Sequence, residues 1–225
     1  MTTQAAEKSS ANTGSFFQKE IGIFRALVIL LVLMAVTSTV MYAIGQKYFW
    51  RTQARTPQER GLNYFMALTQ KEPDKPEHWV DLGWYHYQAG DYTQALDSHL
   101  RALEINPSHA GGLFNAGITL IQMSDHASAA EYLQMATQVN PDYWEGYFAL
   151  GVAYVGLEEW ELAQAALVDA ADIYGASPEV WFYLGHVAEN LNEFEDAAYY
   201  YEQVLRFISD FAPALEALER ISNFS

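Results

Sequence analysis

WVDLGWYHY at residues 79–87 is the first of four related stretches, and the others are LFNAGITLI at 113–121, YFALGVAYV at 147–155 and WFYLGHVAE at 181–189. Each stretch has a glycine at its centre, and the four glycines lie 34 residues apart at Gly83, Gly117, Gly151 and Gly185. A fixed period of this length indicates an array of repeated structural units. The sequence is therefore analysed as copies of one unit.

Small residues recur with the same period outside these stretches. Alanine follows each glycine by twelve residues, at Ala95, Ala129, Ala163 and Ala197, and small residues follow by nineteen, at Ala102, Ala136, Ala170 and Val204. Residues without bulk let two helix backbones approach closely. We therefore expect a pair of helices in each unit, with the glycine on the first and the alanines on the second.

The pattern resembles the tetratricopeptide repeat, a helix-turn-helix unit with a large residue, Leu-Gly, spaced alanines and a closing proline. The large residues stand four positions before each glycine, at Trp79, Leu113, Tyr147 and Trp181, and Pro107 and Pro141 close the first two units. The resemblance implies an all-α fold, an α-solenoid of about four full repeats over residues 76–211. The units are 76–109, 110–143, 144–177 and 178–211.

Both ends of the array are expected to be capped. Residues 57–72 have the pattern of an amphipathic helix, which we interpret as the second half of a degenerate repeat. Residues 212–225 are predicted to form a C-terminal capping helix, in which Glu219 takes the glycine position. Because close packing excludes a charged residue there, no further unit is expected to stack beyond it.

The N-terminal segment predicts a membrane anchor. Residues 1–20 are expected to be a disordered tail, and ALVILLVLMAVTSTVMYAIG at 26–45 holds twenty residues without a charge, enough for one membrane-spanning helix. We place the whole anchor segment at 21–50. A cleavable signal peptide is disfavoured, since Met41 stands where a cleavage site needs a small residue. Basic residues near the span weakly favour a cytoplasmic repeat domain, but the short tail before one span is typical of bacterial anchors. We predict an inner or plasma membrane protein with an extracytoplasmic repeat domain.

Charge is divided unevenly along the chain. Residues 1–55 contain six Lys or Arg and two acids, whereas the remainder contains six Lys or Arg and 26 acids. An acidic domain repels phosphate backbones, so nucleic acid is excluded as a partner. It favours a protein partner with basic flanks, although an acidic surface also serves to keep a repeat array soluble.

The resemblance also implies a binding site. In this family the first helices line a concave groove, and the groove positions are the fifth, ninth and twelfth of each unit. They are apolar here except in the fourth unit, where the twelfth position is Glu189: Val80, Trp84, Tyr87, Phe114, Ile118, Ile121, Phe148, Val152, Val155, Phe182 and His186. An apolar wall of this length is expected to be covered by an apolar segment of a partner. The alternative is that these side chains bury one another.

No sequence motif predicts catalysis. Cysteine is absent, and no phosphate-binding loop, nucleophile elbow or zinc-protease helix occurs. His86 and His99 are expected to form a hydrogen-bonded core pair, and no metal or other cofactor is predicted. We expect a non-enzymatic scaffold or assembly factor of a membrane-associated complex. The alternative is a permanent accessory subunit, whose anchor would pack against other transmembrane subunits through Thr37, Ser38 and Thr39.

Overall fold

The computed structural model describes residues 34–45, 56–175 and 177–222. The chain divides into two compact units, residues 1–56 and 57–225. In the first unit residues 34–44 are helical. The predicted tail at 1–20 and the first part of the predicted span, 26–33, lie outside the described residues. Across the residues that are described, no helix is both long enough and apolar enough to cross a membrane.

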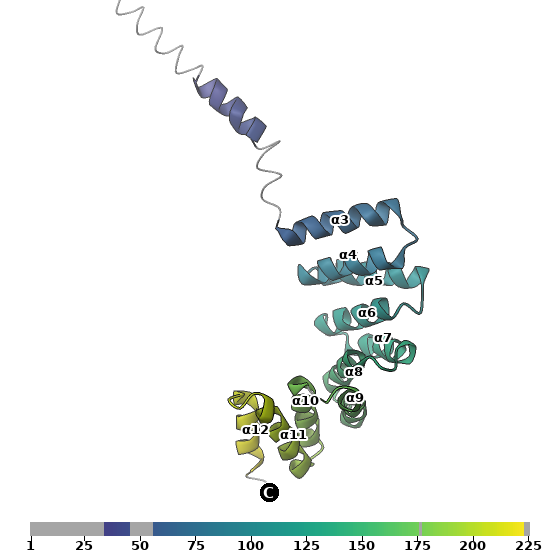
Figure 1. The fold of residues 1–225 in the computed structure, drawn as a ribbon, viewed down its shortest axis with the longest axis vertical. Coiled ribbons are helices and arrows are strands. Elements are labelled where there is room, and N and C mark those ends of the chain that lie inside the picture. Colours follow the sequence, from purple (N-terminus) through teal and green to yellow (C-terminus); the bar gives the residue numbers. More distant parts are fainter. Residues whose placement is uncertain (1–33, 46–55, 176, 223–225) are drawn as a thin grey trace, which may run out of the picture. The chain divides into compact units, whose positions relative to one another are not determined.

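The second unit consists of antiparallel helix pairs connected by short turns, and no strand occurs among its described residues (Figure 1). The four units of the sequence correspond to α4 (Pro76–Gln88) with α5 (Tyr92–Ile105), α6 (Ala110–Gln122) with α7 (His126–Val139), α8 (Trp144–Gly156) with α9 (Trp160–Ile173), and α10 (Pro178–Asn190) with α11 (Phe194–Phe207). The array is preceded by α3 (Pro57–Lys71) and followed by α12 (Ala212–Ile221). The predicted all-α repeat solenoid is confirmed.

The turn within each unit is set by one backbone conformation. Gly90, Ser124, Glu158 and Asn192 all have positive φ, between 59° and 81°. A residue in this left-handed region ends an α-helix, since its backbone directs the chain away from the helix axis. The four residues are 34 apart, so the repeat period extends to the turn, although only the first unit uses glycine.

The core of each unit is the contact between its two helices. All four alanines that follow the glycines by twelve residues are completely buried. Each glycine faces the residue sixteen positions later: a Cβ added to Gly151 would lie 2.6 Å from Cγ of Leu167, and one added to Gly185 would lie 2.7 Å from Cδ1 of Tyr201. Small residues on both helices therefore permit the close approach that the sequence predicts.

First helices also pack against first helices. α4 contacts α6, α6 contacts α8, and α8 contacts α10. Because each unit has one first helix and one antiparallel second helix, successive first helices run parallel. Residues at equivalent positions of α4, α6, α8 and α10 are therefore brought next to one another, and these four helices carry the candidate site.

Candidate functional site

The eleven predicted groove residues lie on α4, α6, α8 and α10, and none of them is fully buried. We call this set, together with Glu189, the first-helix face. Steps of four and three residues place the fifth, ninth and twelfth positions of a helix on one side of it. Trp84 is the most accessible member, with 39% of its surface exposed. The others are half-buried.

The fifth-position phenylalanines join neighbouring units. Their ring centroids lie 5.0 Å from Tyr143 for Phe114, 5.4 Å from Tyr183 for Phe148, and 5.4 Å from Phe211 for Phe182, in each case edge to face. Such pairs stabilise packing beyond the area they bury. These rings therefore hold the stack together, and the free part of the first-helix face is provided mainly by the ninth and twelfth positions.

An aromatic row begins at Trp84. Its ring stacks on Tyr87, with centroids 5.4 Å apart and planes at 9°, and Tyr87 contacts Tyr92 at the start of α5, with centroids 5.5 Å apart. Burial, and then the neighbouring Tyr92, raise the pKa of Tyr87, while a hydrogen bond with Gln122 lowers it. Tyr87 therefore keeps its hydroxyl proton at neutral pH and remains a hydrogen-bond donor.

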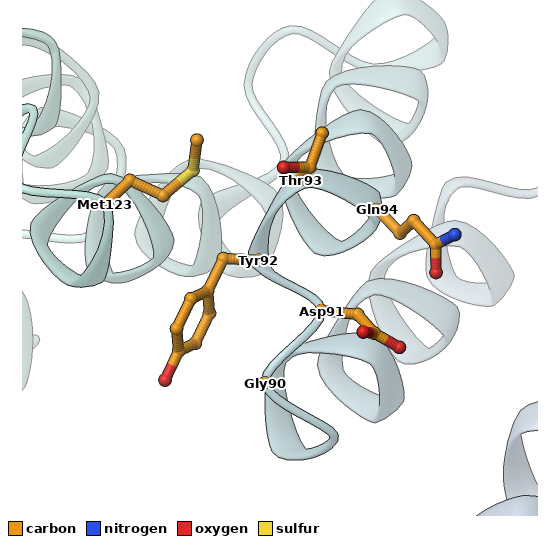
Figure 2. A pocket seen from close by; sticks show the side chains of 6 residues that line it. All are labelled: Gly90, Asp91, Tyr92, Thr93, Gln94 and Met123. Atoms are coloured by element: carbon orange, nitrogen blue, oxygen red, sulfur yellow. The ribbon is translucent and has the colours of Figure 1, made fainter.

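The row ends beside a pocket. This pocket has a volume of about 410 Å³ and is lined by Gly90, Asp91, Tyr92, Thr93, Gln94 and Met123 (Figure 2). Figure 2 shows Tyr92 projecting from the start of α5 and Met123 entering from a neighbouring helix end, so two units contribute to the pocket. Asp91, Thr93 and Gln94 are exposed and can exchange hydrogen bonds with a ligand.

Sequence reasoning did not include Tyr92 and Met123 in the site. A signal for Tyr92 exists, since aromatic or imidazole rings recur with the 34-residue period at the first position of every second helix: Tyr92, His126, Trp160 and Phe194. Trp160 contacts a predicted site residue, His186, with ring centroids 5.9 Å apart. Met123 has no comparable signal.

At the twelfth position of the fourth unit, Glu189 is bound by the chain itself. Arg220 of α12 donates from Nε to Oε1 at 2.6 Å and from a terminal nitrogen to Oε2 at 2.8 Å, and the Tyr201 hydroxyl donates to Oε2 at 3.0 Å. These hydrogen bonds, chiefly those from Arg220, lower the pKa of Glu189. The capping helix thus occupies this end of the first-helix face.

The predicted hydrogen bond between His86 and His99 is wrong. His99 is fully buried, yet neither of its ring nitrogens has a hydrogen-bond partner among the described residues, and neither has Nδ1 of His86. Burial, and then the nearby His86, lower the pKa of His99 to about 4. Within the described ranges, no three histidine or carboxylate side chains gather so that they could hold a metal ion.

Comparison with known proteins places these helix pairs in a family. Models described as "Tetratricopeptide repeat" match residues 59–110 and 114–178, and residues 178–211. No curated protein sequence matches the chain. Solved structures do match, all at identities that show the fold alone.

MamA (residues 41 to the end) from Desulfovibrio magneticus RS-1 is 22% identical with a TM-score of 0.65, covering 77% of this chain and 96% of that one. YrrB, described as a TPR protein with an unusual peptide-binding site, is 18% identical with a TM-score of 0.65, covering 71% and 82%. The first TPR of Spaghetti (RPAP3), bound to the HSP90 peptide SRMEEVD, is 19% identical with a TM-score of 0.52, covering 52% and 94%. From the repeat period, the helix pairs and the matched residues we conclude that the chain belongs to the tetratricopeptide repeat family.

Proposed function

We propose that the protein is a membrane-anchored, non-catalytic interaction module that scaffolds or assembles a membrane-associated protein complex. Its first-helix face binds an apolar segment of a partner protein whose flanks are basic. The members of this face that are free to make contacts run from Trp84 and Tyr87 on α4 to Val152 and Val155 on α8.

One observation carries the proposal: the exposed Trp84 ring, held in place by stacking on Tyr87. Tryptophan and tyrosine dominate binding energy at protein interfaces, and a ring already fixed by a neighbour loses little conformational entropy on binding. Two structural neighbours, YrrB and the Spaghetti domain, are described with bound peptide or a peptide-binding site. Their likeness supports peptide binding as the activity of this fold.

The membrane part of the proposal rests on the uncharged run at residues 26–45. Twenty helical residues span about 30 Å, the thickness of the hydrocarbon core of a bilayer. An anchor this close to the repeats would hold the bound partner near the membrane. The orientation we propose is extracytoplasmic.

A permanent accessory subunit is the second candidate function. It is favoured by Thr37 and Thr39, whose hydroxyls donate to backbone carbonyls within the helix at 2.8–3.0 Å. Hydroxyl side chains satisfied in this way allow close contact between membrane helices. Stoichiometric co-purification that survives high salt would favour the subunit, whereas substoichiometric association would favour the assembly factor.

The test of partner binding is photocrosslinking in intact membranes from a photoreactive residue placed at Trp84. The matched control places the same residue at Leu162, which is 49% exposed on the second helix α9. We expect a discrete crosslinked protein from position 84 that is absent from position 162. Identical products from both positions, or none from position 84 in a folded protein, would overturn the proposed binding face.

The test of anchoring is extraction of membranes with alkaline carbonate, followed by protease treatment of sealed vesicles. We expect the chain to stay in the membrane fraction and the repeat domain to be cleaved only from the extracytoplasmic side. Release by carbonate would refute the anchor, and cleavage from the cytoplasmic side would reverse the orientation.

A further inference from the structure

The starts of the first helices carry a row of glutamates. Glu77 in α4, Glu145 in α8 and Glu179 in α10 are each the second residue of their helix, and α6 has Gly111 there. From Glu77, steps of three and four residues lead to Val80 and Trp84, so the glutamates border the first-helix face on one side. Glu77 and Glu179 are exposed and Glu145 is half-buried. We call these three residues the acidic edge.

The other border of the first-helix face is uncharged. The thirteenth residues of α4, α6 and α10 are Gln88, Gln122 and Asn190, all exposed, and α8 has Gly156 there. We call the three amides the amide edge. Amides donate and accept hydrogen bonds but do not attract charge.

The first helices are aligned closely enough for these borders to be continuous. At the starts of α4 and α6, a Cβ on Gly111 would lie 3.9 Å from Cγ1 of Val80. At their ends, Tyr87 of α4 is hydrogen-bonded with Gln122 of α6. Because both ends of the two helices are in register, the glutamates lie along one side of the apolar stripe and the amides along the opposite side.

No cation within the four units neutralises the acidic edge. α4, α6, α8 and α10 contain no Lys or Arg, and the two arginines of residues 76–211 both lie on second helices. There Arg101 pairs with Glu104 at 2.8 Å and Arg206 bonds with Gln203 at 2.9 Å. Lys75 immediately precedes α4, so the edge is most negative at Glu145 and Glu179.

First-turn glutamates also stabilise their own helices through the helix dipole, and this effect must be separated from binding. The chain offers a matched control, since the second helices α9 and α11 have Glu161 and Glu195 in their first turns. Both are exposed. Removing either pair of charges has the same dipole effect, but only one pair borders the first-helix face.

We propose that the bound segment is amphipathic and aligns one row of lysine or arginine side chains along the acidic edge, leaving its uncharged flank against the amide edge. This inference rests on the proposed function and adds the orientation of the partner. The probe is a synthetic Leu-rich helical peptide with lysines on one flank, and its analogue has glutamines in place of the lysines. The full-length chain is held in neutral phosphatidylcholine nanodiscs, with empty nanodiscs subtracted.

Binding is measured by fluorescence anisotropy at low and high salt. We expect the lysine peptide to bind more tightly than the glutamine peptide, and E145Q/E179Q to weaken it about five-fold at low salt, as two exposed ion pairs allow. E161Q/E195Q should change the affinity less than two-fold, and the difference should disappear at high salt. Equal binding of both peptides would overturn the inference but leave the proposed function intact. Failure of both peptides to bind would overturn both.

Orientation is tested separately because the chain has no cysteine. A peptide with one cysteine among its lysines should form a disulfide with G111C at the acidic edge and not with Q122C at the amide edge. Equal yields at both positions would contradict the proposed alignment.

Discussion

Gly117 in α6 faces Leu133 in α7 so closely that a Cβ added to the glycine would lie 2.5 Å from Cγ of the leucine. The same relationship recurs between the glycine of each unit and the residue sixteen positions later. The period of 34 residues therefore records a steric requirement of the helix pair.

Replacing Gly117 by alanine should lower the free energy of unfolding by about 1–3 kcal/mol, the usual cost of overpacking a well-packed core. Denaturant unfolding of the full chain measures it. The control is Gly111→Ala in the same helix, where the nearest atom to the new Cβ, in the His109 side chain, is 3.4 Å away. There we expect no loss, because alanine favours a helix by up to about 1 kcal/mol over glycine. Equal losses at both positions would contradict the steric argument.

Glu158 has a φ of 59°, a conformation that strains a residue with a side chain. Glu158→Gly should therefore stabilise the protein by about 0.5–1 kcal/mol, despite the greater chain entropy of glycine in the unfolded state. The control, Glu161→Gly in the first turn of α9, should instead destabilise it slightly. Thermal unfolding distinguishes the two, and a stability loss in Glu158→Gly would show that the turn is not strained.

The sequence predicts the features that repeat, because each unit imposes the same constraint: the glycines, the alanines and the positions of the turns. It does not predict contacts made once. Arg220 binds Glu189 across 31 residues, and only the packed position of α12 brings them together. Likewise, helical spacing identifies the side of α6 on which Phe114 lies, but the contact of its ring with Tyr143 depends on how the next unit packs. The predicted span cannot be compared, since most of residues 1–33 fall outside the described part.

His99 should make the protein less stable in mild acid. Its pKa is about 4 in the folded protein and 6.5 as the ordinary value, so between these values the unfolded chain binds more protons. Stability is complete above about pH 6.5 and falls by up to about 3 kcal/mol as the pH falls to 4. His99→Leu, which copies Leu133 and Leu167 at the same position, should remove this pH dependence.

The same variant should be more stable than the parent at neutral pH by about 1 kcal/mol or more, because it removes a buried imidazole whose nitrogens have no hydrogen-bond partner among the described residues. Urea unfolding at several pH values between 4 and 8 measures both effects. A His99→Leu protein that keeps the parental pH slope would show that other groups cause it.

Arg220 should fix the capping helix to the last repeat. Arg220→Gln removes two hydrogen bonds to the Glu189 carboxylate, and exchange of the α12 amide hydrogens should accelerate by about five-fold, since a bidentate pair at a partly exposed site contributes about 1 kcal/mol. Arg220→Lys should restore only part of the protection, because an ammonium cannot form the two-pronged contact. The control is Arg206→Gln, whose parent residue bonds to Gln203 within the same helix.

The contribution of this pair also has a defined pH dependence. The pKa of Glu189 is lowered in the folded protein, so the stabilisation is present above its ordinary value of 4.5 and is lost as the pH falls through the lower, folded value. In Arg220→Gln this loss should shrink, while the loss caused by His99 at higher pH should remain. If Arg206→Gln and Arg220→Gln expose the α12 amides equally, the ion pair does not hold the cap, and Glu189 would then be free to bind a basic side chain of the partner.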